Sequence, residues 1–197
     1  MRSLALILPV LALTALPALA QTSTYKVDSV HSEVGFKVRY LVGKTAGAFS
    51  KYTGTVMVDD KDVTKSRVEL TVDAASVNTN NEARDKHLRT ADFFDVEKHP
   101  TLSFTSVAVK EVAKGQLEVT GDFTLRGVTK RITVPVKSLG ATINPRTKQT
   151  AVAFESAFTI ARKDYGVSYG LADAGNVVVG NEVEILLTIL ANKTDGK

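Results

Sequence analysis

The chain has 197 residues, with 25 lysines and arginines, 21 aspartates and glutamates, and no cysteine. The lack of cysteine excludes disulfides, thiolate catalysis, thiolate metal sites and a lipid-modified N-terminal cysteine. The net charge of +4 is spread along the chain without a long basic run, so the sequence gives no sign of a nucleic-acid-binding protein.

The first twenty residues have the three regions of a secretory signal peptide. Arg2 supplies a positive charge, Leu4–Leu13 is an almost unbroken apolar run, and Ala18-Leu19-Ala20 places small residues at a cleavage site. The run is too short for a membrane span, and no later stretch approaches the roughly 20 apolar residues that a span needs. We therefore predict cleavage after Ala20, export of the protein, and one domain over residues 21–197.

Most of the remaining sequence alternates apolar and polar residues with a period of two, which is typical of strands with one apolar face. The alternating stretches are 34–40, 68–72, 102–104, 117–125, 132–136, 152–160 and 183–189. Turn signals such as Lys114-Gly115 and Asn144-Pro145 separate them. We predict an all-β protein of about eight antiparallel strands joined mainly by short turns, arranged as a barrel or a sandwich.

Residues 79–95 break this alternation. Asn80 or Asn81 is suited to cap a helix, because an asparagine side chain accepts a hydrogen bond from a backbone N–H of the first turn. We predict one or two short helices in a long connection. Phe93 and Phe94 in this connection either anchor a helix or plug one end of a barrel.

Five motifs, in order along essentially the whole chain after the leader, resemble those of the YceI-like, or polyisoprenoid-binding, proteins. The first three are Val27–Phe36 with its Asp-x-x-His-Ser sequence, Gly47-Ala48-Phe49, and His87–Asp95 followed by His99-Pro100. The other two are the Gly-strand-Gly-Val-Thr hairpin Thr120–Thr129 and the basic-x-Asp-aromatic-Gly element Ala161–Val167. Each motif is weak alone, but five in order are specific.

The resemblance implies an extended lipocalin-like barrel in the periplasm of a Gram-negative bacterium. It also implies an elongated apolar tunnel that takes a long isoprenoid chain, such as a polyprenyl quinone or phenol, and no other cofactor. The natural ligand and its head group stay open, as does the choice among carriage, storage, sensing and a stress response. A homodimer is compatible with the sequence.

The apolar stripes supply the candidate ligand-binding residues. An eight-stranded barrel of this length is either hollow or filled by its own side chains. At Phe123, the neighbouring Gly121 on the same strand face indicates free space. The residues expected on the tunnel wall are Phe36, Val38, Phe49, Leu102, Phe104, Phe123, Phe154 and Phe158.

Three polar residues are candidates for contacts with a ligand head group. His31 starts a predicted strand, where a barrel mouth is expected, or is instead a structural histidine bonded to backbone or carboxylate. Arg162 and Asp164 follow the stretch 152–160 and either orient a head group or form a structural ion pair, which we favour.

Two other classes of protein compete with this interpretation. A metal-dependent periplasmic enzyme would use His31, His87 and His99, but their spacing matches no compact metal motif. No nucleophile elbow or phosphate loop is present in the sequence. A β-sandwich interaction module would have a filled core and no bound lipid. We predict a binding protein without enzymatic activity or a metal site.

Overall fold

The computed structural model describes residues 22–171 and 178–194, and the predicted leader, residues 1–20, lies outside the described residues. The strands are β1 Thr22–Val27, β2 Glu33–Tyr40, β3 Gly43–Phe49, β4 Tyr52–Asp59, β5 Arg67–Asp73, β6 Val77–Asn78, β7 Thr101–Ala113, β8 Gln116–Leu125, β9 Val128–Ile143, β10 Thr150–Ala161 and β11 Val179–Lys193. The helix α1 spans Glu82–Arg89, and three 3-10 helices span Val63–Lys65 (η1), Ala74–Ser76 (η2) and Arg162–Tyr165 (η3). Within the described residues, no helix is long and apolar enough to cross a bilayer.

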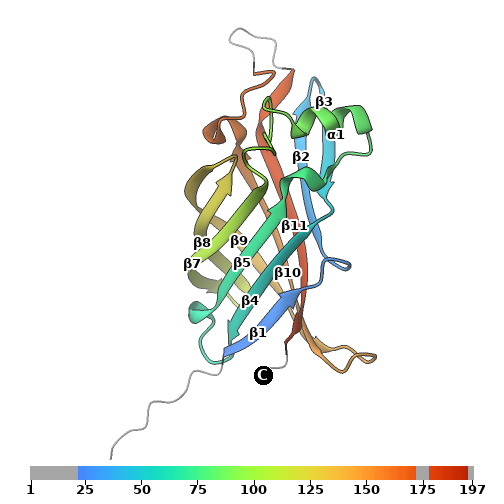
Figure 1. Ribbon diagram of the computed structural model, residues 1–197. Helices are drawn as coiled ribbons and strands as arrows, with labels where there is room; N and C mark the ends of the chain where they lie inside the picture. Colours follow the sequence, from blue (N-terminus) through green and yellow to red (C-terminus); the bar gives the residue numbers. More distant parts are fainter. Residues whose placement is uncertain (1–21, 172–177, 195–197) are drawn as a thin grey trace, which may run out of the picture.

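Eight of the strands close into an antiparallel barrel (Figure 1). β1 pairs with β4 on one side and with β11 on the other, and the remaining strands follow in the order β4-β5-β7-β8-β9-β10-β11. The predicted all-β lipocalin-like barrel is therefore confirmed. The sandwich alternative is wrong, because the strands form one closed sheet.

Three further strands, β2, β3 and β6, extend the wall around the upper end of the barrel in Figure 1. β1 and β2 both pair with β11, so residues 28–32 interrupt what would otherwise be one long strand. The Ser32 hydroxyl bridges this gap, since it donates to the carbonyl of Leu190 at 3.2 Å and accepts from the Leu190 N–H at 2.9 Å. β3 then pairs with β2, and β6 with β3.

The alternating stretches all fall within observed strands, but the period-two pattern does not predict β1, β3, β4 or β6. In β4 the inward position between Tyr52 and Val56 is Gly54, which carries no apolar signal. A Cβ at Gly54 would meet the carbonyl oxygen of Glu69 at 2.7 Å. Glycine is therefore needed there for close approach of the neighbouring strand, and this requirement hides the strand from a search for apolar alternation.

The connection between β6 and β7 closes the upper end of the barrel. The Asn81 side chain accepts from the Arg84 N–H at 3.0 Å and caps α1, which confirms the predicted helix. The residues after Thr90 form turns rather than a second helix. Phe94 packs into the main apolar cluster, with its ring 5.5 Å from that of Phe49, so it plugs the barrel end. Phe93 instead packs outside this cluster against His87, at 5.1 Å between ring centres.

Candidate ligand-binding cavity

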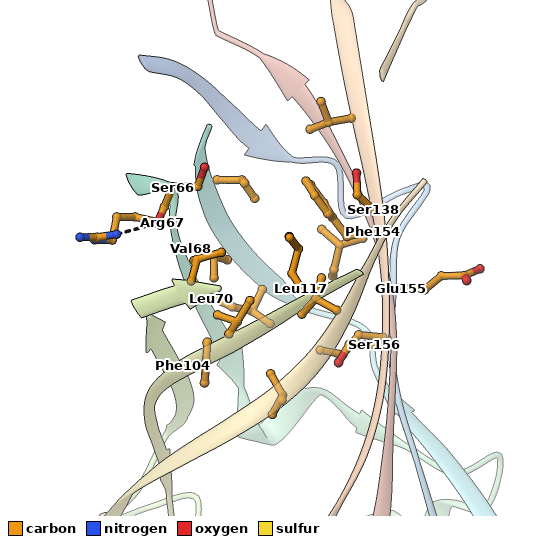
Figure 2. Close-up of a pocket in the computed structure, with 18 of the residues that line it drawn as sticks. Ser66, Arg67, Val68, Leu70, Phe104, Leu117, Ser138, Phe154, Glu155 and Ser156 are labelled. Carbon is orange, nitrogen blue, oxygen red and sulfur yellow. Dashed lines mark hydrogen bonds between the residues drawn. The ribbon is translucent and has the colours of Figure 1, made fainter. Parts of the chain in front are cut away.

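An apolar cavity of about 430 Å³ occupies the barrel interior. This volume lies within the roughly 300–1,000 Å³ that is typical of small-molecule sites. All eight barrel strands contribute to its wall. Figure 2 shows the side chains of Leu70, Leu117 and Phe154 pointing toward one another. The charged groups of Arg67 and Glu155 point away from the cavity, which leaves its interior almost free of charge.

The barrel is hollow rather than filled. Close-packed interiors leave few voids larger than a water molecule, so core side chains facing inward would lose nearly all accessible surface. Along β8 the wall runs from Leu117 to Phe123, which corresponds to roughly 20 Å of strand at about 3.4 Å per residue. Several wall residues keep part of their surface accessible although they point inward, namely Leu70, Phe104, Phe123, Phe154, Phe158, Ile185, Leu187 and Ile189.

The cavity opens at the lower end of the barrel in Figure 1, away from α1. Its wall there includes Val63 of η1 in the β4–β5 connection, Gly115 in the β7–β8 turn and Gly140 near the end of β9. Some polar residues of the wall lie in this region, among them Ser66 and Glu111. The Ser66 hydroxyl accepts from the N–H of Asp59 at 3.1 Å, and a Glu111 carboxylate oxygen accepts from the N–H of Gly115 at 3.1 Å. A ligand with one polar end fits this arrangement with its apolar chain inside and its polar end at the mouth.

Packed aromatic rings close the opposite end. Tyr165 of η3 is 2% exposed and lies edge-on to Phe123, with 5.4 Å between ring centres. Burial raises the pKa of the Tyr165 hydroxyl. Together with Phe49 and Phe94, these rings fill the barrel between the cavity and α1. Among the described residues, the tunnel is therefore blocked at this end by packed aromatic rings.

Glycine 121 lies under an aromatic ring on the inner wall. A Cβ added at Gly121 would collide with the ring of Phe104 and would lie 2.6 Å from the carbonyl oxygen of Thr105. The space beside Phe123 is therefore occupied by Phe104, and the expectation of free space at this position is wrong.

This contact gives a stability prediction for Gly121→Ala. Because the new methyl group meets a backbone oxygen as well as a ring, we expect the free energy of unfolding to fall by about 1–3 kcal/mol in urea titrations. A double variant with Phe104→Leu removes the ring contact and should recover part of this loss. An unchanged free energy of unfolding for Gly121→Ala would show that β7 and β8 do not approach as closely as described.

Six of the eight expected wall residues line the cavity: Phe49, Leu102, Phe104, Phe123, Phe154 and Phe158. The other two lie elsewhere, because β2 extends beyond the hollow part of the barrel. Phe36 is 8% exposed, packs 5.8 Å from the ring of Phe49 at the closed end, and covers Gly47. Val38 lies further along β2, opposite Thr45 of β3 and Val183 of β11.

The sequence-based list misses much of the aliphatic wall. Val56 and Val58 of β4, Val68 and Leu70 of β5, and Ile185, Leu187 and Ile189 of β11 all line the cavity. The alternation itself marks the residues of β5 and β11 as inward-facing. A list built mainly on aromatic residues leaves them out, although aliphatic side chains serve an apolar ligand equally well.

His31 lies outside the cavity, at the interruption between β1 and β2 rather than at a mouth. Its Nδ1 is 2.9 Å from Oδ2 of Asp28, and its side chain is 65% exposed. The carboxylate of Asp28 also accepts from the Val30 N–H at 3.0 Å and from Nδ2 of Asn192 at 3.2 Å. His31 therefore takes part in a clamp that fastens the interruption to β11, as expected of a structural histidine.

The clamp gives a prediction about pH. The hydrogen bond with the His31 side chain is the main cause that lowers the pKa of Asp28. Because the pKa of Asp28 is lower in the folded protein than the unfolded value of about 3.9, its ionised carboxylate stabilises the fold above that pH. This stabilisation is lost as the pH falls through the lowered pKa. Asp28→Asn should reduce the free energy of unfolding by about 1 kcal/mol at pH 6. In urea titrations at pH 2.5 this difference should shrink, whereas an equal difference at both pH values would show that the charge of Asp28 is not involved.

The expected ion pair between Arg162 and Asp164 is wrong. Arg162 is 4% exposed and donates to three backbone carbonyls, those of Gly180 at 2.7 Å, Val179 at 2.8 Å and Val167 at 3.2 Å. Burial lowers the pKa of its guanidinium. Asp164 instead lies 3.6 Å from Nζ of Lys130. Neither residue lines the cavity.

The three histidines lie in separate surroundings. His31 is in the Asp28 clamp, Nε2 of His87 is 2.7 Å from Asp92, and the ring of His99 lies against Gly127. In residues 22–171 and 178–194 there is no group of three or more His, Asp or Glu side chains able to hold a metal ion. The described residues therefore offer an apolar pocket as the candidate site and no assembled metal centre.

A closed antiparallel barrel with an apolar cavity open at one end defines the class of small barrels that hold apolar ligands. The model of the YceI-like domain matches residues 25–191, and the chain belongs to this family. A UPF0312 protein of Pseudomonas aeruginosa is 36% identical over 174 residues, which cover 86% of this chain and 87% of the relative. Protein YceI of Escherichia coli O157:H7 is 35% identical over 173 residues, with the same coverage of both chains.

Solved structures share the fold. Burkholderia cenocepacia BcnA has a TM-score of 0.74 at 24% identity and covers 83% of this chain and 98% of its own. The Campylobacter jejuni YCEI protein has a TM-score of 0.70 at 25% identity and covers 85% and 96%. A polyisoprenoid binding domain from Saccharophagus degradans, implicated in plant cell wall breakdown, has a TM-score of 0.64 at 17% identity and covers 86% and 98%.

Proposed function

We propose that the protein binds one long-chain isoprenoid or similar apolar lipid, such as a polyprenyl quinone or phenol, inside the barrel. The observation that carries this proposal is the apolar cavity of about 430 Å³, with polar residues such as Ser66 and Glu111 at its mouth. A long tail gains from such a lining, because each buried methylene contributes about 0.8 kcal/mol. One five-carbon isoprene unit therefore contributes about 3–4 kcal/mol before the costs of ordering the ligand and removing it from a membrane.

An isoprenoid is favoured over other apolar ligands by the family and by one structural neighbour that is named as a polyisoprenoid binding domain. The cavity wall consists mainly of aliphatic and aromatic side chains, which suits the binding of a hydrocarbon chain. Tunnel length and shape, rather than polar contacts, should then determine which chain lengths bind.

Titration of the delipidated protein with isoprenoid alcohols of graded length, followed by native mass spectrometry, tests the proposal. We expect one ligand per chain, with affinity that rises with each isoprene unit until the tail fills the cavity and then levels off. A quinone head group without a tail is the matched probe and should bind at least about 100-fold more weakly, since its few apolar atoms bury little area. Equal affinity for the head group and the full molecule would contradict the proposal.

We further propose that the protein works in the periplasm and carries, stores or senses its ligand there. The leader sequence supports this location. The intact mass of the exported protein should correspond to a chain that begins at Gln21. A protein that retains Met1 and stays in the cytoplasm would contradict this proposal.

A further inference from the structure

The β9 segment and its flanking turns are basic and free of acidic residues. Between Asp122 and Glu155 the sequence has no Asp or Glu, and its basic residues are Arg126, Lys130, Arg131, Lys137, Arg146 and Lys148. Three of them are paired, Lys130 with Asp164, Arg131 with Asp122 and Lys137 with Glu155. Arg146 and Lys148 are exposed and have no ion-pair partner among the described residues.

These two basic residues lie at the open end of the cavity. They belong to the turn that joins β9 to β10, and this hairpin projects from the lower end of the barrel in Figure 1. Gly140 and Ala141, on the same hairpin, belong to the cavity wall. The free positive charge therefore stands beside the mouth through which a ligand enters.

Apolar side chains are exposed at the same end. Ala141 and its partner Val152 both line the cavity, and Ile143 lies two residues beyond Ala141 on the same strand face. Ile143 thus continues the cavity wall out of the barrel, where it is 65% exposed. Val112 in the β7–β8 hairpin and Leu139 on β9 are 51% and 46% exposed.

We infer that the open end of the barrel docks on an anionic lipid bilayer, with Ile143, Val112 and Leu139 entering the interface and Arg146 and Lys148 meeting the lipid head groups. Lys and Arg side chains near a membrane surface are attracted to anionic lipids, and apolar side chains gain by entering the boundary region. This inference rests on the proposed function, because a ligand that resides in a membrane can then pass into the cavity without crossing water.

The closed end supplies the contrast. The β2–β3 turn also exposes apolar side chains, Tyr40, Leu41 and Val42 at 50%, 52% and 104%. Lys44 is paired with Glu184 at 3.3 Å, but Lys37 and Lys163 are exposed at this end too. The contrast therefore rests on the aromatic packing that separates this end from the cavity. Substitutions at the closed end are therefore matched controls for those at the open end.

The test is co-sedimentation of the ligand-free protein with vesicles of phosphatidylglycerol and phosphatidylcholine, and with vesicles of phosphatidylcholine alone. We expect binding to the anionic vesicles only, weakening as salt rises. Arg146→Glu with Lys148→Glu should reduce the affinity at least about 10-fold, and Ile143→Ser about 3-fold or more. Lys37→Glu with Lys163→Glu makes the same change of net charge at the closed end. The vesicle affinity of this double variant, and that of Val42→Ser, should stay within about 2-fold of the affinity of the unaltered protein.

Equal binding to both kinds of vesicle, no binding to either, or an equal loss in the open-end and closed-end charge variants would overturn the inference. The thermal midpoint of each variant checks that it is folded. Isoprenoid binding without vesicles is measured on the two charge variants and on Val42→Ser, and it should not change. Docking is measured on ligand-free protein, so the two proposals can fail separately. Loss of vesicle docking with intact isoprenoid binding contradicts only this inference, whereas loss of isoprenoid binding contradicts the proposed function.

Discussion

Replacing Arg162 by methionine should destabilise the protein more than any other single substitution considered. The variant keeps the length of the apolar stem but removes the donors to the carbonyls of Gly180, Val179 and Val167. Each buried acceptor left without a partner costs about 1–3 kcal/mol, partly offset because a buried charge is also removed. We expect the free energy of unfolding from urea titration to fall by about 2–4 kcal/mol.

Two variants separate this effect from loss of charge. Arg162→Lys keeps the charge, but one ammonium group does not reproduce the fixed fork of a guanidinium, so we expect an intermediate loss. Arg131→Met removes an exposed arginine whose partner is Asp122, and it should cost under about 1 kcal/mol. If Arg162→Met cost no more than Arg131→Met, the three hydrogen bonds of Arg162 would not stabilise the fold as expected.

The second large effect is expected from Leu70→Trp on ligand length. Leu70 is half-buried on the cavity wall, so a larger ring enters empty space rather than a packed core. Overpacking a filled core costs about 1–3 kcal/mol, and here we expect a smaller change in the thermal midpoint of the ligand-free protein. The longest isoprenoid that binds tightly should become shorter, with at least about a 10-fold loss of affinity for chains one isoprene unit longer.

Thr71→Trp is the matched control, because Thr71 follows Leu70 on β5 and is exposed on the outer face. Its length preference should equal that of the unaltered protein. A large drop in the thermal midpoint for Leu70→Trp, with no change in the preferred chain length, would mean that Leu70 is core packing and that the ligand does not reach it.

The barrel could be predicted from the sequence because its strands face the interior on one side and water on the other. That difference produces the alternation in β8 from Leu117 to Leu125 and in β11 from Val183 to Ile189. Two of the strands that the alternation does not predict, β3 and β4, have a glycine at an inward position, Gly47 and Gly54. Their pairing partners, rather than their own sequence, determine that these residues must be glycine.

The sequence predicts which side chains face the barrel interior, but not which of these side chains line the cavity. Phe36 and Phe123 follow the same alternation, yet Phe36 lies in the packed closed end and Phe123 lines the cavity. Which end is closed depends on the connection that carries Phe94 and on the turn that carries Tyr165, and no local pattern specifies where these meet. The hydrogen-bond partners of Arg162 could not be predicted, because they are backbone carbonyls and any residue type can supply one.

The central claim is that the hollow barrel holds one apolar ligand. Its most direct test is solvent extraction and mass spectrometry of the protein isolated without detergent from the cells that make it. We predict that organic solvent releases close to one long-chain apolar molecule per protein chain. If this ligand has the longest tail that the unaltered protein binds, it should be absent from the extract of a Leu70→Trp variant. Recovery of a folded protein that releases no apolar molecule, or only a water-soluble one, would contradict the claim.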